Sequence, residues 1–167
     1  MKIKQLQKTI MKTRKLNNIP FLFALIFLVS CDNNKVYDEY IEVETSGWNA
    51  ADTLAFEIEL NSTNGDLFDF LIGLRNNNEY LYSNIFLFVE LENPQGITQI
   101  DTLQYLVAEP NGKWKGAGIG AIKHNLFKYK ESQVLEDGLY KIKITHGMRS
   151  ELLHGIEDIG LRIESVN

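Results

Sequence analysis

Residues 54–60, LAFEIEL, constrain the fold more than any other segment, because large apolar side chains alternate there with alanine or glutamate. Successive side chains of a β-strand point to opposite faces of the sheet, whereas apolar positions on a helix recur every three or four residues. The segment therefore predicts a strand with one buried and one solvated face. Residues 156–166 show a similar alternation, with Ile159, Leu161 and Ile163 expected on one face.

Other segments have a strand-like composition but differ in their expected environment. Residues 36–43 mix β-branched and aromatic side chains with charged ones, which indicates an edge strand. Residues 80–91 become almost continuously apolar in their second half, which favours a central strand covered on both faces. Residues 123–129 fit either a strand or a short helix, and 147–155 form a connection that could contain a helical turn. The remaining expected strands are 67–74, 97–107 and 139–146.

Turn residues separate these segments. Asn-Gly at 64–65 predicts a hairpin between the two strands that flank it, because both residues tolerate a positive φ angle. Asn-Pro-Gln-Gly at 93–96 predicts a return turn, and Asp-Gly at 137–138 predicts a hairpin-type turn. No helix longer than two turns is expected. About seven to eight strands separated by turns predict an all-β fold, an antiparallel β-sandwich, over residues 36–167.

The N-terminal segment has a different character. Residues 1–18 carry six basic side chains and no acidic one, and an unbroken apolar run follows at 21–29. That run is shorter than the roughly 20 residues that an ordinary spanning helix needs. It leads into Ser30 and Cys31, and Cys31 is the chain's only cysteine. These features are typical of an export signal, and with the cysteine they resemble a bacterial lipoprotein signal.

The resemblance implies that the Cys31 sulfur carries a lipid and that cleavage after Ser30 removes a signal peptide, residues 1–30. Residues 31–35 would then be the lipidated N-terminus and a short polar tether. Two or more acyl chains anchor a protein stably, because each buried methylene contributes about 0.8 kcal/mol. We therefore expect a domain that a membrane holds through its lipid anchor. The alternative is an uncleaved anchor or a buried helix with a free thiol, and Met11 is an alternative start to Met1.

Length and charge restrict the class of the mature chain. The 137 residues after residue 30 suffice for one domain with a single core. All 22 acidic residues but only 11 of the 17 basic ones lie in this part, so its net charge is −11. This charge argues against nucleic acid as a partner, which requires a basic face. No second cysteine is present to form a disulfide within the chain.

Signatures of catalysis and metal binding are weak. His124, His146 and His154 lie on separate segments without the spacing of a zinc motif. The glycine-rich residues 113–120 could cradle a phosphate, but the Lys-Ser or Lys-Thr of a phosphate-binding loop does not follow. A bulged or tight loop packed under Trp114 is the favoured interpretation. We expect no enzyme activity, no cofactor and no metal.

Hydrogen-bonding and aromatic side chains concentrate around one loop, and Trp114 adds another aromatic side chain beside glycines. Such sets favour protein interfaces or sugar stacking. The alternative is that the tyrosines only cap the core and that the arginine pairs with an acidic neighbour. The candidate interaction surface consists of Arg75, Asn76, Tyr80, Tyr82, Asn84 and Trp114.

An ordered series of short motifs runs through the chain after Cys31. The motifs are RNNNEYLYSNIFLF at 75–88, DTLQY at 101–105, GKWKGAG at 112–118, GLY at 138–140, HGMR at 146–149 and IGLRI at 159–163. The series resembles the GldH family of gliding-motility lipoproteins, over about residues 36–166. No single motif carries the resemblance alone.

The resemblance implies a non-enzymatic accessory lipoprotein of the envelope of gliding bacteria, required for gliding motility and linked to the type IX secretion machinery. Other gliding-motility lipoproteins or envelope proteins would be its partners. The outer membrane, facing the periplasm, is the expected location. Only the lipid attachment at Cys31 carries over as a site. The alternative function, from the residues alone, is that of a carbohydrate-binding β-sandwich lipoprotein.

Overall fold

The computed structural model describes residues 34–61 and 65–166. The expected signal peptide and Cys31 lie outside the described residues. Within the described part the chain forms strands and loops, and no helix there is long and apolar enough to cross a membrane. The strands are β1 (Lys35–Glu42), β2 (Trp48–Asn49), β3 (Leu54–Leu60), β4 (Leu67–Asn76), β5 (Asn84–Glu92), β6 (Thr98–Leu106), β7 (Lys123–Val134), β8 (Gly138–His146), β9 (Leu152–Leu153) and β10 (Ile156–Val166).

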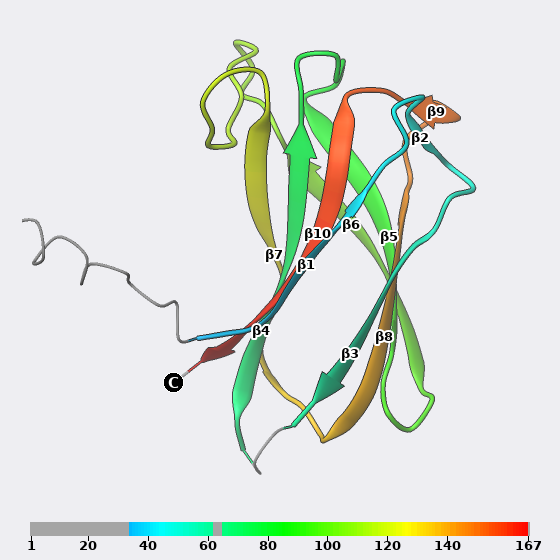
Figure 1. Cartoon of the computed structure of the whole chain (residues 1–167), viewed down its shortest axis with the longest axis vertical. Helices are drawn as coiled ribbons and strands as arrows, with labels where there is room; N and C mark the ends of the chain where they lie inside the picture. The colour runs from blue at the N-terminus through cyan, green and yellow to red at the C-terminus, as the bar shows by residue number, and fades with distance from the viewer. Residues whose placement is uncertain (1–33, 62–64, 167) are drawn as a thin grey trace, which may run out of the picture. The chain divides into compact units, whose positions relative to one another are not determined.

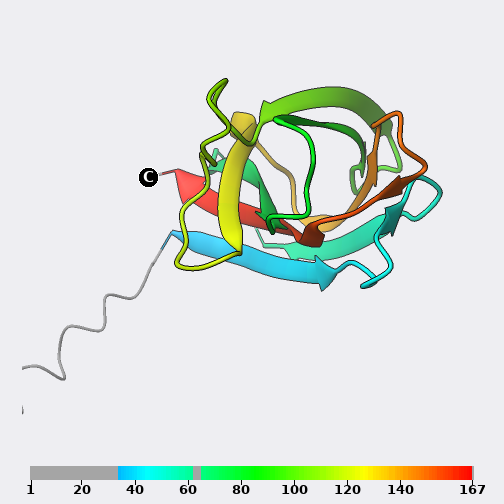
Figure 2. The same cartoon turned by 90° about the horizontal axis from the view of Figure 1, so that it is seen from above.

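Two four-stranded sheets face each other and enclose the core (Figures 1 and 2). The β4 sheet has the strand order β1-β10-β4-β7, and the β5 sheet has the order β3-β8-β5-β6. All neighbouring strands are antiparallel, and β2 pairs with β9 in a separate two-stranded ribbon. The prediction of an all-β antiparallel sandwich is confirmed.

Period-two burial builds the core from both sheets. In β3, Phe56 and Ile58 are buried while Glu57 is exposed, as the alternating sequence predicted. Ile159 and Leu161 of β10 are fully buried. Each such side chain contributes roughly 1.5–3 kcal/mol when it is removed from water. The strand β1 pairs only with β10, which confirms the predicted edge strand.

The two predicted hairpins at Gly65 and Gly138 are wrong. Both glycines have a positive φ angle, 98° and 128°, so the chain turns near them as expected. However, β3 pairs with β8 whereas β4 pairs with β10 and β7, so each connection crosses from one sheet to the other. Turn residues determine the local direction of the chain and do not select the sheet that the next strand joins. The predicted turn at 93–96 does join paired strands, β5 and β6.

The structure decides the ambiguous segment at Lys123, and it differs from the sequence-based expectation at two others. The segment from Lys123 is a strand, β7, and not a short helix. Residues 147–155 contain the short strand β9 and no helical turn. The strand β5 is central, between β6 and β8, but Phe88 is 44% exposed, so only its inner face is covered.

Candidate interaction surface

Asn76, a member of the predicted surface, ends β4 and points into the core. It is fully buried, and its side-chain oxygen accepts a hydrogen bond from Asn125 Nδ2 at 3.0 Å. Asn76 Nδ2 donates to the backbone oxygen of Asn77, the first residue of the following loop, at 3.3 Å. Asn76 therefore holds this loop from inside and offers no surface to a partner.

Three aromatic residues of the predicted surface gather at the loop between β4 and β5. Tyr80 is 3% exposed, and its hydroxyl donates to the backbone oxygen of Asn84 at 2.7 Å. The Tyr80 ring centroid lies 5.7 Å from that of Tyr82 and 6.5 Å from that of Trp114. Burial raises the pKa of Tyr80, so its hydroxyl stays protonated as a donor. Tyr80 thus supports the loop, whereas Tyr82 is 40% exposed.

Arg75 lies on the outer face of the β4 sheet, because successive residues of a strand point to opposite faces and Asn76 points inward. Its Nε donates to Asp158 Oδ1 at 2.7 Å, and Nη2 lies 2.5 Å from Oδ2. Asp158 is only 4% exposed. Burial raises the pKa of Asp158, and the Arg75 charge opposes that rise. Arg75 is thus paired with a carboxylate of its own sheet. It is separate from the group formed by Tyr80, Tyr82 and Trp114.

Tyr40 is a residue of this outer face that was not predicted from the sequence. It extends from β1 across the sheet, so close to Gly160 and Gly73 that a Cβ on either glycine would come within 2.4 Å of the tyrosine side chain. Its hydroxyl lies 2.5 Å from His124 Nε2 on β7. The Arg75 guanidinium lies 5.0 Å from the centre of its ring. Tyr40 therefore connects all four strands of the β4 sheet.

A sequence signal for this arrangement exists. Gly73-Leu74-Arg75 and Gly160-Leu161-Arg162 are the same tripeptide, and each places a glycine and an arginine two residues apart. In the sheet, Gly160 is directly opposite Gly73. Two adjacent glycines on neighbouring strands leave a shallow groove, which marks a close approach by another side chain.

An apolar area lies on the outer face of the β5 sheet, and we call it the Phe88 patch. Phe88 and Phe86 point outward from β5, where their inner neighbours Ile85 and Leu87 are fully buried. On β6 the outer face includes Ile100, which is 68% exposed. The Phe88 patch consists of Tyr82, Phe86, Phe88, Ile100, Leu106 and Met148.

A cavity of about 470 Å³ adjoins the Phe88 patch. It is lined by Tyr82, Phe86, Gly147, Met148 and Arg149. The backbone NH of Phe86 points at Met148 Sδ at 3.4 Å, and the NH of Gly147 donates to the Phe86 oxygen at 2.7 Å. Methionine adapts its shape to different partners, so the cavity can admit an apolar side chain of another protein.

The composition of the Phe88 patch separates protein binding from sugar binding. A sugar-binding face needs two or three exposed, coplanar aromatic rings. Among the Phe, Tyr and Trp side chains of residues 34–61 and 65–166, Tyr82 and Phe88 are the exposed ones, at 40% and 44%, and the cross-strand neighbours of Phe88 are Thr102 and Thr145. This mixed apolar surface favours a protein partner.

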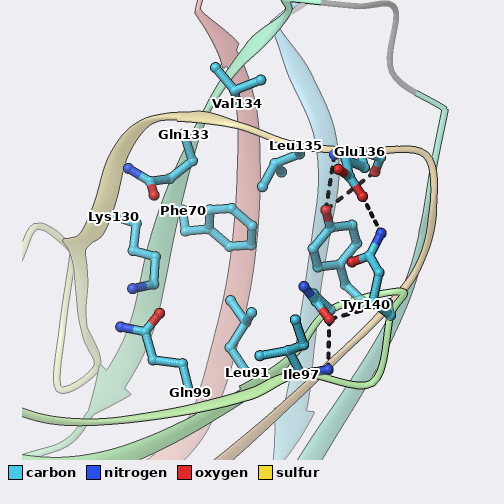
Figure 3. Close-up of a pocket in the computed structure, with 12 residues that line it drawn as sticks. Phe70, Leu91, Ile97, Gln99, Lys130, Gln133, Val134, Leu135, Glu136 and Tyr140 are labelled. Carbon is cyan, nitrogen blue, oxygen red and sulfur yellow. Dashed lines mark hydrogen bonds between the residues drawn. The ribbon is translucent and has the colours of Figure 1, made fainter.

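A second cavity, of about 480 Å³, lies between the sheets near the ends of β7 and β5 (Figure 3). Its apolar wall includes Phe70, Leu91 and Leu135, and Lys130 contributes a charge. The Tyr140 hydroxyl accepts from the backbone NH of Glu136 at 3.1 Å, which fixes the loop after β7 (Figure 3). The mixed lining has no convergent set of polar groups that would define a ligand.

The three histidines lie in two regions of the domain, with His146 and His154 both near Gly47 and Trp48. His124 is next to Tyr40, and His146 lies at 3.0 Å from the backbone oxygen of Trp48. In the described part of the chain no three His, Cys, Asp or Glu side chains are grouped so that they could hold a metal ion. The glycine-rich segment is a loop between β6 and β7, as the sequence predicted.

Comparison with known proteins agrees with the motif series. The sequence model of the GldH lipoprotein family matches residues 35–163, nearly the whole described domain. The chain belongs to this family. A gliding motility lipoprotein GldH homolog from Christiangramia forsetii is 40% identical over 152 residues, which cover 86% of this chain and 92% of the relative. The gliding motility lipoprotein GldH of Flavobacterium johnsoniae is 40% identical over 151 residues, with the same coverage.

Proposed function

We propose that this chain is a lipid-anchored envelope protein that takes part in gliding motility by binding other envelope proteins. Its similarity to the gliding motility lipoprotein GldH of Flavobacterium johnsoniae, across 86% of the chain, carries the proposal. The Phe88 patch supplies the binding surface, because apolar areas exposed on a folded domain mark contact sites. No catalytic step is part of the proposal, since the family resemblance brings no catalytic residue.

The anchor is the lipid on Cys31, with residues 1–30 as the signal peptide and 31–35 as the tether. The basic leader, the short apolar run and the single cysteine support this assignment. We place the domain at the outer membrane, facing the periplasm, and we assign its partners to the gliding and type IX secretion apparatus. Both assignments rest on the family resemblance.

The anchor can be tested in a gliding bacterium whose own copy of the gene is deleted. Deletion is expected to stop colony spreading, and the full-length chain is expected to restore it. Cys31→Ala is expected to abolish labelling with radioactive palmitate, to leave the larger precursor uncleaved and to prevent restoration, because the thiol is the acyl acceptor. A labelled and cleaved Cys31→Ala chain would contradict the anchor, and normal spreading after deletion would contradict the role in motility.

A further inference from the structure

One end of the β4 sheet exposes apolar side chains on its outer face, and we call this area the Val134 patch. Leu67 of β4 is directly opposite Val166 of β10 on one side and Val134 of β7 on the other, so the three side chains share a face. Val134 is 66% exposed and Val166 is 37% exposed. Val36 at the start of β1 is 48% exposed. The Val134 patch consists of Val36, Leu67, Val134 and Val166.

The chain enters the sandwich at this same end. The Asn34 backbone oxygen accepts a hydrogen bond from the NH of Ser165 at 2.7 Å, so residue 34 is fixed beside the end of β10. Figure 1 shows the start of β1 and the end of β10 side by side. Three residue steps separate Asn34 from Cys31, and a fully extended chain spans at most about 11 Å over that length. A lipid on Cys31 would therefore hold the Val134 patch close to the bilayer.

The charges around the Val134 patch are paired, although the chain after residue 30 is strongly acidic. Lys128 lies 3.5 Å from Asp69 and 2.8 Å from Glu131, and Lys35 lies 3.2 Å from Asp38. Arg162 pairs with Glu164 in the same region. These three basic and four acidic side chains sum to a net charge of −1, against −11 for the whole chain after residue 30, so repulsion from anionic headgroups is weak at this end of the domain.

We propose that the Val134 patch lies on the lipid surface of the membrane that holds Cys31, and that it fixes the orientation of the domain. This inference rests on the proposed lipid anchor. Apolar side chains enter the boundary between headgroups and acyl chains at a depth of about 5–10 Å. The ten residues of β4 span about 30 Å, so the loop that carries Tyr82 would stand about that far from the bilayer. The orientation would leave that end of the domain open to partners.

The test uses the full-length chain, processed and lipidated in cells, purified in detergent and reconstituted into phosphatidylethanolamine vesicles that contain doxyl-labelled lipid. Single-cysteine variants Val134→Cys and Val166→Cys carry a fluorophore on the new thiol. Ile119→Cys is the matched control, because Ile119 is fully exposed in the loop at the opposite end of β7. We expect the doxyl lipid to quench positions 134 and 166 at least about twofold more than position 119, since only the former would be at the acyl boundary.

Each outcome has a distinct meaning. Quenching at 134 and 166 above that at 119, which disappears in detergent, supports the inference. Equal quenching at all three positions overturns it, and a disulfide between two unlabelled Val134→Cys chains would overturn it too, because it would assign the patch to a second copy. The parent chain without an added cysteine tests the anchor itself, because a lipidated Cys31 cannot react with the maleimide fluorophore. Labelling of this parent chain would refute the proposed anchor, and with it the inference.

Discussion

Substitution of Gly160 by alanine is expected to destabilise the sandwich through Tyr40, although alanine normally suits a strand better than glycine. The added Cβ would lie 2.4 Å from a ring carbon of Tyr40, so the tyrosine must leave its position across the β4 sheet. Gly160 lies within strand β10 and is not among the glycines with a positive φ angle, so its backbone conformation suits alanine. The cost therefore arises from the tyrosine and not from the backbone.

The magnitude follows from the contacts that Tyr40 would lose. About 100 Å² of the half-buried ring would return to water, which costs about 2.5 kcal/mol. Loss of the hydrogen bond to His124 adds about 1 kcal/mol, and loss of the Arg75 contact adds about 0.5–1 kcal/mol. Alanine in place of glycine stabilises the strand by about 0.5–1 kcal/mol, which offsets part of this loss. Because part of the clash can relax, we expect a net loss of about 1–3 kcal/mol.

A double-mutant cycle isolates this mechanism. Urea unfolding of the mature chain without its lipid, residues 32–167, is measured for Gly160→Ala, Tyr40→Ala and the double variant. In the Tyr40→Ala background, Gly160→Ala is expected to become neutral or stabilising, because no ring remains to be displaced. An equal loss of stability in both backgrounds would refute the role of Tyr40. A stabilising effect of Gly160→Ala in the wild-type background would also refute it.

Two further predictions concern buried polar groups. Arg75→Ala should lower the free energy of unfolding by about 1–3 kcal/mol, because it leaves the buried Asp158 carboxylate unpaired; a change in cell spreading without a change in stability would instead assign Arg75 to an interface. Burial lowers the pKa of His146 from its usual 6.5, so the unfolded chain binds the proton more readily and stability should fall as the pH drops below about 6.5. His146→Gln should flatten this part of the pH dependence of the melting temperature, and an unchanged slope would contradict the assignment.

The sequence predicted most strands correctly where burial follows the chain's own alternation. The segment Leu54–Leu60 and the inward residues of β10 behave as their period-two pattern requires. The strand β7 was ambiguous because Lys123–Val134 has no sustained period, and its pairing with β4 is interrupted by register shifts near Ser132, which has a φ angle of 49°. The sheet that each strand joins depends on contacts across the core, and local turn residues do not encode those contacts.

The candidate surface was predicted only in part, because residue type does not reveal depth in a loop. Tyr80 is buried against Trp114, which comes from a segment more than 30 residues away in the sequence, whereas Tyr82 remains exposed. Phe86 and Phe88 suggested a strand covered on both faces. The sequence does not distinguish an apolar strand face that is buried within the chain from one that is exposed and binds a partner.

A comparison of two glutamate variants tests most directly whether the Phe88 patch binds a partner. Phe88→Glu and the matched control Leu126→Glu both replace a strand residue of similar exposure, 44% and 41%, on the outer faces of different sheets. Each is expressed at normal abundance in the deletion strain, and colony spreading, melting temperature and crosslinked partners are measured. We expect Phe88→Glu to keep its melting temperature but lose spreading and the partner, while Leu126→Glu keeps all three. Normal spreading and crosslinking by Phe88→Glu would contradict the proposed binding surface.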